Sequence, residues 1–532
     1  MRRFILFALV LATVTALLSG AAVAQDERVL IIGESFNIDY MDPGRSFSFT
    51  PFQIFLGIYQ TLLKFPANGI TPLELDVASG YEVSEDGLTY TFTLRDDIIF
   101  SDGSGLTSDD VAFSLLRFKH LKGYGSSLAV SLASVDTPDD YTAVIHLNQP
   151  DPAFLNKLTF GGMSILNADV VRAAGGTDAE NASEVDDLDV WFQNNSVGSG
   201  PYILSQYEPE VIVELTRNEN YWGDELPYFD RIIMTHIPEV SSRVLALEAG
   251  DIHIARELLP ANVDDLAGVE GIETLQTASV QMNYLAMNRD PDVGGPMSDE
   301  RVNAAVRYAL DYDGIKQLNS PSAYTPGSVI PVGIEAAWDP SNALSQDQDR
   351  ARELLAEAGY PDGFDATLTY WDDAIGGVEF GVMAQKIAAD LSEIGINLTL
   401  VPTDFSNWID PYRAGELQFT VALWLPDFAD PSNYLSFVPA YEGSLNVANR
   451  VNWTEANADP AILELRNAAD VESDPMKRAE LYDQIQQFWQ DRGPWVPYLQ
   501  STQQVAHVSG LQGTVMHPFW GLVYVNELSI AE

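Results

Sequence analysis

An alternating series of predicted strands and helices over residues 366–424 most constrains the fold. Residues alternate between apolar and polar in each predicted strand, whereas apolar residues recur at helical spacing in the segments between them. Strands that alternate with helices of this length favour parallel pairing through crossover helices. The sequence therefore predicts an α/β fold here. We expect strands over residues 366–371, 396–401 and 418–424, and helices over 378–394 and 405–414.

A second informative segment, residues 84–111, predicts a strand, a turn and a capped helix. Leu88, Tyr90, Phe92 and Leu94 alternate with threonines, as in a strand with one apolar face. An Asp-Gly turn follows at residues 102–103. Thr107 or Ser108 then suits the first position of a helix whose first turn is acidic.

Two of the predicted strands in the α/β unit end in an aromatic residue followed by carboxylates. Trp371 precedes Asp372 and Asp373, and Trp424 precedes Asp427 and Phe428. Ligands bind beyond the carboxyl ends of strands in open α/β sheets, so these residues are ligand-binding candidates. A carboxylate there suits an ammonium group, and an indole face suits a cation or a sugar. The alternatives are that both tryptophans belong to the core and that Asp427 caps a helix or braces a turn.

Residues 1–24 have the pattern of a secretory signal peptide. Basic residues precede an apolar run over residues 4–18, and Ala22-Val23-Ala24 forms a small-residue cleavage site before Gln25. A membrane anchor is the alternative, but the run is short for a bilayer span. The chain has no cysteine, which excludes disulfides, thiolate chemistry and a lipid-modified cysteine. We expect a free periplasmic protein.

The formal net charge is −49, with acidic residues spread along the whole chain. Such a chain is a poor partner for nucleic acid or anionic membranes. The charge suits either a soluble, self-repelling surface or a saline habitat in which salt screens the repulsion. The sequence contains no GxSxG, HExxH, GxxxxGK[ST] or GxGxxG motif. We therefore predict a protein that is not an enzyme, holds no cofactor or metal and has no nucleic-acid partner.

Several segments, in order, resemble the extracytoplasmic solute-binding proteins of family 5, which serve peptide-type and nickel-type ABC importers. The most specific is DGLTYTFTLRDDIIFSDG, which starts at Asp86. Other segments extend the resemblance over residues 32–498. They are Met41-Asp42-Pro43, GSGPYILSQYEP, RNENYWGDELPYFDRI, LALEAGDIHIA, DERVNAAVRYALDYDGI, RARELLAEAGYPDGF and WLPDFADPSNYL.

The resemblance implies an α/β, two-lobed periplasmic binding protein fold of type II with an extra inserted domain. Two crossing strands, near residues 284–288 and 495–499, would join the lobes, which close over a ligand by a hinge motion. The implied division has a discontinuous domain I, a domain II that contains the inserted signature segment, and an α/β domain III. Their predicted boundaries are 25–60, 191–284 and 495–532 for domain I, 61–190 for domain II and 285–494 for domain III.

The resemblance also suggests roles for individual residues. In peptide-binding relatives, an aspartate three residues after a tryptophan holds the ammonium of the peptide, and Trp424 and Asp427 match that pattern. No basic residue stands just before Trp424, although Arg413 lies earlier at a loosely similar position and suits a carboxylate. Asn37, which begins the segment NIDYMDPG, is a further candidate.

The implied function is the capture of a small solute, a di- or oligopeptide or a peptide-like compound, and its delivery to an ABC permease with separate ATPase subunits. We expect a monomer. Oligosaccharides and opines are alternative cargoes within the same family. A secreted carbohydrate hydrolase is an alternative of another class, and a sensor that presents its closed form to a membrane receptor is a third.

Overall fold

The computed structural model describes residues 27–223, 226–320, 322–439, 446–519, 521 and 523–531. The predicted signal peptide, with its cleavage site before Gln25, lies outside these residues. In the described ranges, no helix combines the length and the apolar character that a bilayer span requires.

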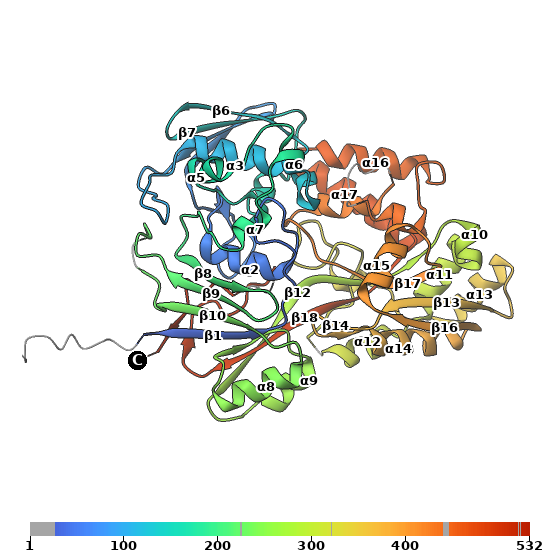
Figure 1. Cartoon of the computed structure of the whole chain (residues 1–532). Helices are drawn as coiled ribbons and strands as arrows, with labels where there is room; N and C mark the ends of the chain where they lie inside the picture. Colours follow the sequence, from blue (N-terminus) through green and yellow to red (C-terminus); the bar gives the residue numbers. More distant parts are fainter. Residues whose placement is uncertain are drawn as a thin grey trace, which may run out of the picture.

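One mixed sheet of ten strands runs through the whole molecule (Figure 1). Its strand order is β16-β13-β17-β12-β18-β11-β1-β10-β9-β8. The strands are β1 (Val29–Glu34), β8 (Tyr202–Glu208), β9 (Ile212–Arg217), β10 (Arg231–His236), β11 (Ile254–Ala255), β12 (Ile272–Met287), β13 (Phe364–Trp371), β16 (Ile396–Thr403), β17 (Phe419–Trp424) and β18 (Trp495–Val508).

The two longest strands, β12 and β18, carry the sheet from one lobe into the other (Figure 1). They pair with each other in an antiparallel manner, with a register shift between Ala278 and Met282. At one end β12 also pairs with β17, and at the other end β18 also pairs with β11. We call the part with β1 and β8–β11 the first lobe and the part with β13, β16 and β17 the second lobe.

The second lobe contains the predicted α/β unit. Strand β13 runs parallel to both β16 and β17, so the three predicted strands are confirmed as neighbours in one sheet. The predicted helix over residues 378–394 begins later, at Phe380, because Val378 and Glu379 form a short strand instead. The helices and short strands are α10 (Pro291–Gly294), η3 (Gly295–Ser298), α11 (Glu300–Ala309), α12 (Tyr312–Asn319), η4 (Pro340–Asn342), α13 (Gln348–Ala358), β14 (Ala374–Ile375), β15 (Val378–Glu379), α14 (Phe380–Ser392), α15 (Phe405–Arg413), η5 (Pro431–Phe437), η6 (Ala448–Val451), α16 (Pro460–Val471) and α17 (Pro475–Arg492).

The first lobe carries a separate four-stranded sheet in the order β4-β5-β7-β6. The signature segment supplies β5, whose Tyr90, Phe92 and Leu94 are buried, and helix α3, which Thr107 caps. This confirms the predicted strand, turn and capped helix. The small sheet comprises β4 (Ala78–Val83), β5 (Thr89–Leu94), β6 (Leu132–Asp139) and β7 (Thr142–Leu147). The other elements are α2 (Phe49–Ile58), β2 (Leu63–Lys64), β3 (Glu74–Leu75), α3 (Ser108–Leu121), η1 (Tyr124–Ala129), α4 (Phe154–Lys157), η2 (Gly161–Met163), α5 (Ala168–Ala174), α6 (Ala182–Val185), α7 (Asp189–Phe192), α8 (Val240–Ala249), α9 (Pro260–Leu266), β19 (Leu511–Gln512) and β20 (Ser529–Ile530).

A buried ion cluster anchors helix α3 to the chain before α2. Arg117 donates to both carboxylate oxygens of Asp42, over 2.8 and 2.6 Å, and to both of Asp186, over 2.8 and 2.9 Å. These carboxylates hold the pKa of Arg117 above its ordinary value despite burial. The cluster thus joins α3 to the segment that precedes α2 and to the segment after α6. The division into three domains with the boundaries given above stays a prediction.

Candidate ligand-binding site

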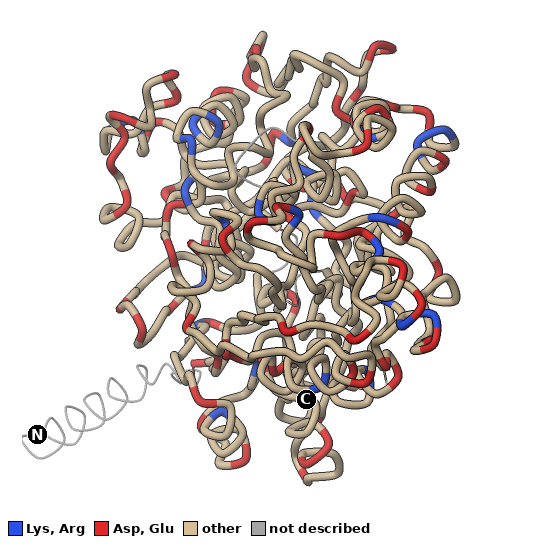
Figure 2. The backbone as a smooth tube through the Cα atoms, turned by 90° about the vertical axis from the view of Figure 1, so that its right-hand side faces the viewer, with Lys and Arg blue, Asp and Glu red and all other residues tan. Residues whose placement is uncertain are grey.

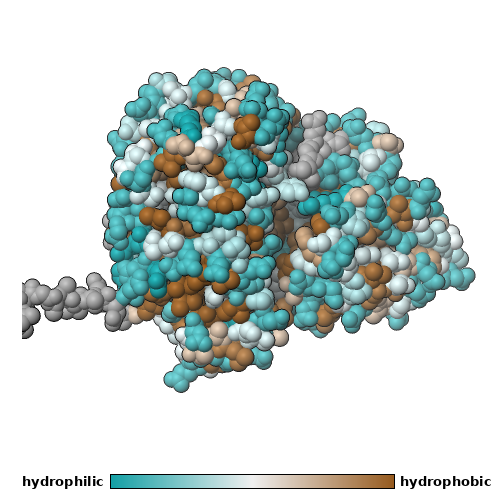
Figure 3. Space-filling model, in the orientation of Figure 1, coloured by the Kyte–Doolittle hydropathy of each residue, from teal (hydrophilic) through white to brown (hydrophobic). Residues whose placement is uncertain are grey.

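A cleft separates the two lobes and contains a cavity. Figure 3 shows the furrow between the lobes on one face of the molecule. Inside the cleft lies a cavity of about 220 Å³ that residues from both lobes line. The described lining residues are Phe47, Phe49, Phe52, Tyr124 and Phe160 from the first lobe, and Trp371, Phe380, Phe405, Trp408, Ile409, Arg413, Val421, Ala422, Leu423, Trp424, Leu425, Pro426, Asp427 and Arg450 from the second.

The second-lobe wall is built on the carboxyl ends of two adjacent strands. Strands β13 and β17 are parallel neighbours, so Trp371 and Trp424 come to the same edge of the sheet. Helix α15 lies along this edge, and the indole of Trp408 donates to the Thr420 hydroxyl in β17 over 2.9 Å. The two strand ends that the sequence singled out therefore face one cavity.

A chain of hydrogen bonds fixes the polar part of the site. The Trp424 indole donates to the Asn433 side-chain oxygen over 2.7 Å, and the Asn433 amide donates to Oδ2 of Asp427 over 3.0 Å. Asn433 lies in η5, which Asp430 caps by accepting from the Ser432 backbone. Trp424 is only 7% exposed and packs edge-on against Phe437. Trp424 thus belongs to the core and to the cavity wall at the same time.

The charged groups of the cavity are Asp427, Arg413 and Arg450. Burial raises the pKa of Asp427 to about 6, while the Asn433 amide and the Arg450 charge oppose the rise. The Arg450 guanidinium lies 5.4 Å from the ring centroid of Tyr412 and 5.8 Å from that of Trp424. Within the described part of the chain, no carboxylate forms an ion pair with Arg450. The site therefore offers a proton-sensitive anion and a cation to a ligand.

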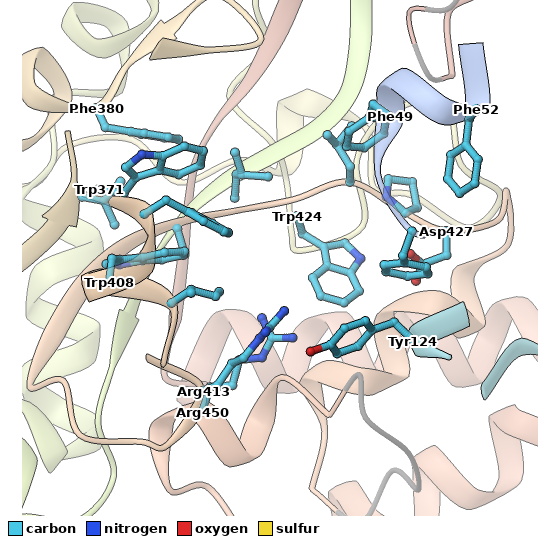
Figure 4. Close-up of a pocket in the computed structure, with 18 of the residues that line it drawn as sticks. Phe49, Phe52, Tyr124, Trp371, Phe380, Trp408, Arg413, Trp424, Asp427 and Arg450 are labelled. Atoms are coloured by element: carbon cyan, nitrogen blue, oxygen red, sulfur yellow. The ribbon is translucent and has the colours of Figure 1, made fainter. Parts of the chain in front are cut away.

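Aromatic rings form most of the remaining wall (Figure 4). In the second lobe, the Trp371 and Phe405 ring centroids lie 4.6 Å apart, and Trp408 stacks on Trp371 at 6.3 Å. In the first lobe, the edge of Phe160 meets Phe52 at 4.9 Å. Arg413 reaches across the cleft, with its guanidinium 5.4 Å from the Tyr124 ring centroid. Such a cavity suits a ligand with both apolar and charged parts.

The structure brings four of the six residues proposed from sequence to this cavity, namely Trp371, Arg413, Trp424 and Asp427. Phe428 is 1% exposed and lies outside the described lining, although it follows Asp427 directly. Asn37 is exposed on the first lobe, also outside the lining, and its backbone N–H donates to the Thr50 hydroxyl over 3.1 Å.

Sequence reasoning missed several lining residues. Phe405 and Trp408 stand in a predicted helix at i and i+3, a spacing that marks a common face. The predicted helix connects two of the predicted strands, so its position near the strand ends could have indicated that Phe405 and Trp408 line the site. Arg450, Phe49 and Tyr124 carry no comparable signal, because they reach the cavity only through the packing of the lobes. Among the described residues, no group of three or more His, Asp or Glu side chains is placed to hold a metal ion.

Two lobes on a shared pair of long strands, with a cavity between them, define the class of two-lobed solute-binding proteins. The sequence model of the bacterial extracellular solute-binding proteins, family 5, matches residues 73–444, which is more than half of the chain. The chain belongs to this family, as its motifs indicated. Its members are binding proteins and not enzymes. The hydrolase alternative is therefore wrong.

Relatives and solved structures agree with this assignment. The chain is 29% identical over 497 residues to heme-binding protein A of Haemophilus influenzae, covering 87% of this chain and 85% of the relative. It is 27% identical over 531 residues to the probable D,D-dipeptide-binding periplasmic protein DdpA of Escherichia coli, covering 98% of both.

The fold also matches solved structures. For CtaP from Listeria monocytogenes the TM-score is 0.82 and the sequence identity is 21%, and the match covers 96% of this chain and 100% of CtaP. The TM-score is 0.76 for DppA from Helicobacter pylori in complex with the peptide STSA, at 24% identity, 96% of this chain and 100% of that one. The predicted type II periplasmic binding protein fold is confirmed.

Proposed function

We propose that this protein is the periplasmic substrate-binding component of an ABC importer for small peptides or peptide-like compounds. It captures one solute between its lobes and passes it to a membrane permease that works with separate ATPase subunits. The observation that carries this proposal is the cavity between two lobes joined by the continuous strand pair β12 and β18. Closure of such lobes shields a ligand without altering it.

The charges in the cavity suit a peptide. Asp427 would accept hydrogen bonds from the N-terminal ammonium, as a carboxylate does in charge-assisted pairs. Arg450 or Arg413 would receive a carboxylate of the same ligand. The names of the relatives support peptide-like cargo, since they include D,D-dipeptide-binding, dipeptide-binding and glutathione-binding proteins.

Direct binding tests the proposal. The purified full chain would be titrated with dipeptides, tripeptides, glutathione and oligosaccharides by calorimetry, and the ligand recovered afterwards. Saturable binding of peptides, with the ligand recovered intact and the radius of gyration reduced on binding, is expected. Saturable binding of oligosaccharides alone would replace the peptide proposal with the sugar alternative.

Transport and location require tests in cells. A strain without this protein should lose uptake of the bound peptide, and the mature protein should be a periplasmic monomer that begins at Gln25. Unchanged uptake together with the loss of a transcriptional response to the peptide would instead identify a sensor.

A further inference from the structure

Three large aromatic side chains remain exposed at the walls of the cavity. Phe405 of the second lobe is 45% exposed, and Phe49 and Tyr124 of the first lobe are 38% and 52% exposed. All three line the cavity, from opposite sides of the cleft. Exposed rings that line a cavity are typical of a binding surface and contribute little to the core.

The second-lobe ring packs against two tryptophans. Phe405 is the first residue of α15, which Asp404 caps by accepting from the Asn407 backbone. Its ring rests on Trp371 at 4.6 Å with an interplanar angle of 55°, and Trp408 lies 6.1 Å away. A ring fixed in this way loses little conformational entropy when a ligand covers it.

The aromatic part and the acidic part of the cavity are separate. Figure 4 shows Asp427 on one side of Trp424, and Trp371, Phe380 and Trp408 on the other. A ligand whose ammonium meets Asp427 would therefore extend past the Trp424 indole toward Phe405. The Arg450 guanidinium lies 5.8 Å from the Trp424 ring centroid on that path. Beyond it, Trp371, Phe405 and Trp408 favour an apolar portion of the ligand.

We propose that the cleft selects cargo with a flat aromatic ring, which lies against Phe405 and Trp371 of the second lobe. Aromatic rings contact one another in offset or edge-on arrangements that add to the gain from burial. This inference rests on the proposed peptide cargo and specifies its side chain.

Matched dipeptides test the preference. The full chain would be titrated by calorimetry with Ala-Ala, Ala-Phe, Phe-Ala and the cyclohexylalanine analogues of the last two. At least one phenylalanine peptide should bind at least about tenfold more tightly than Ala-Ala. It should also bind more tightly than its saturated analogue, because the analogue keeps the bulk of the ring and loses its flat face.

Variants test the location. Phe405→Ala should abolish the preference for the aromatic peptide, and Phe405→Leu should reduce it. Tyr81→Ala, which removes a ring of similar exposure (42%) on β4, should leave it unchanged. Circular dichroism and melting curves would verify folding. If the preference persists in both Phe405→Ala and Trp371→Ala, the proposed location of the aromatic ring is overturned. If all five dipeptides bind with equal affinity, the aromatic selectivity is overturned, although peptide binding stands.

A non-peptide pair separates this inference from the proposed function. 3-Phenylpropionate and 3-cyclohexylpropionate carry the same carboxylate with and without the flat ring. If no peptide binds but 3-phenylpropionate binds more tightly than its saturated partner, the aromatic selectivity holds and the peptide function is overturned. If none of these probes binds, both are overturned.

Discussion

The ammonium of Lys157 in the first lobe lies 5.1 Å from the ring centroid of Phe428 in the second lobe. Lys157 belongs to α4 and donates to Asp151 over 2.7 Å, and Phe428 directly follows the cavity residue Asp427. The ring is 1% exposed because the first lobe helps to cover it. Phe428, which is adjacent to the proposed ligand-binding residue Asp427, thus contacts both lobes.

Phe428→Ala should weaken ligand binding by about 1–2 kcal/mol, because the state with the lobes in contact loses an apolar contact and a cation–π interaction. Calorimetry with the tightest dipeptide would give the affinity, and X-ray scattering would give the radius of gyration with and without ligand. Phe428→Leu, which keeps apolar bulk, should have a smaller effect. Unchanged affinity and scattering in both variants would refute this role.

Asp427→Asn should weaken the binding of a dipeptide with a free N-terminus by about 1.5–3 kcal/mol, the range for a hydrogen bond to a charged group. The variant keeps the shape of the side chain and the contact with Asn433 but loses the negative charge. Asp373→Asn, at an exposed position two residues beyond the end of β13, serves as the matched control and should bind normally. Equal affinities for the two variants would remove Asp427 from the site.

The affinity for a cationic ligand should depend on pH. The pKa of Asp427 is raised to about 6 in the empty cleft, and a bound ammonium would lower it. The ligand prefers the ionised carboxylate, so affinity should be greatest near pH 7 and fall with an acid slope of up to about tenfold per pH unit below about pH 6. Affinity should fall again above about pH 8, where the α-amino group of the dipeptide loses its proton. Titrations in matched buffers would measure this. The slope should disappear in Asp427→Asn; if it persists there, another group is responsible.

Arg117→Ala should destabilise the protein by about 3–5 kcal/mol, because it removes the ion pair of the buried Asp186 and leaves the buried Asp42 with only Arg45, 3.9 Å away. Urea unfolding would measure the loss. Removal of the exposed ion pair of Arg350 and Glu353 by Glu353→Ala should cost no more than about 1 kcal/mol. If the two variants cost the same, the buried cluster does not hold α3 in place.

The melting temperature should rise with salt beyond physiological strength. The net charge is −49, and Figure 2 shows acidic residues distributed over the chain with fewer basic ones. Salt screens the repulsion among these charges, which favours the compact state. Calorimetric scans in increasing concentrations of sodium chloride would test this. A melting temperature that does not change with salt would show that repulsion contributes little to stability.

Local patterns in the sequence were sufficient for the elements of the second lobe. The strands β13, β16 and β17 and the helix α15 lie close to their predicted ranges, because alternation and helical spacing determine which side chains can be buried together. The same patterns placed Trp371 and Trp424 at strand ends. Only the strand order, with β13 beside β17, brings both to one cavity.

Which residues meet across the cleft depends on the packing of the two lobes. Nothing near Arg450, Phe49 or Tyr124 in the sequence indicates a shared cavity, and nothing near Phe428 indicates a contact with Lys157. The motifs and local patterns were enough to predict the family, the local elements and the candidate carboxylate Asp427. Contacts between the lobes depend on the packing of the whole chain, because one buried apolar cluster contains both Phe52 of the first lobe and Trp424 of the second, and no short segment encodes such packing.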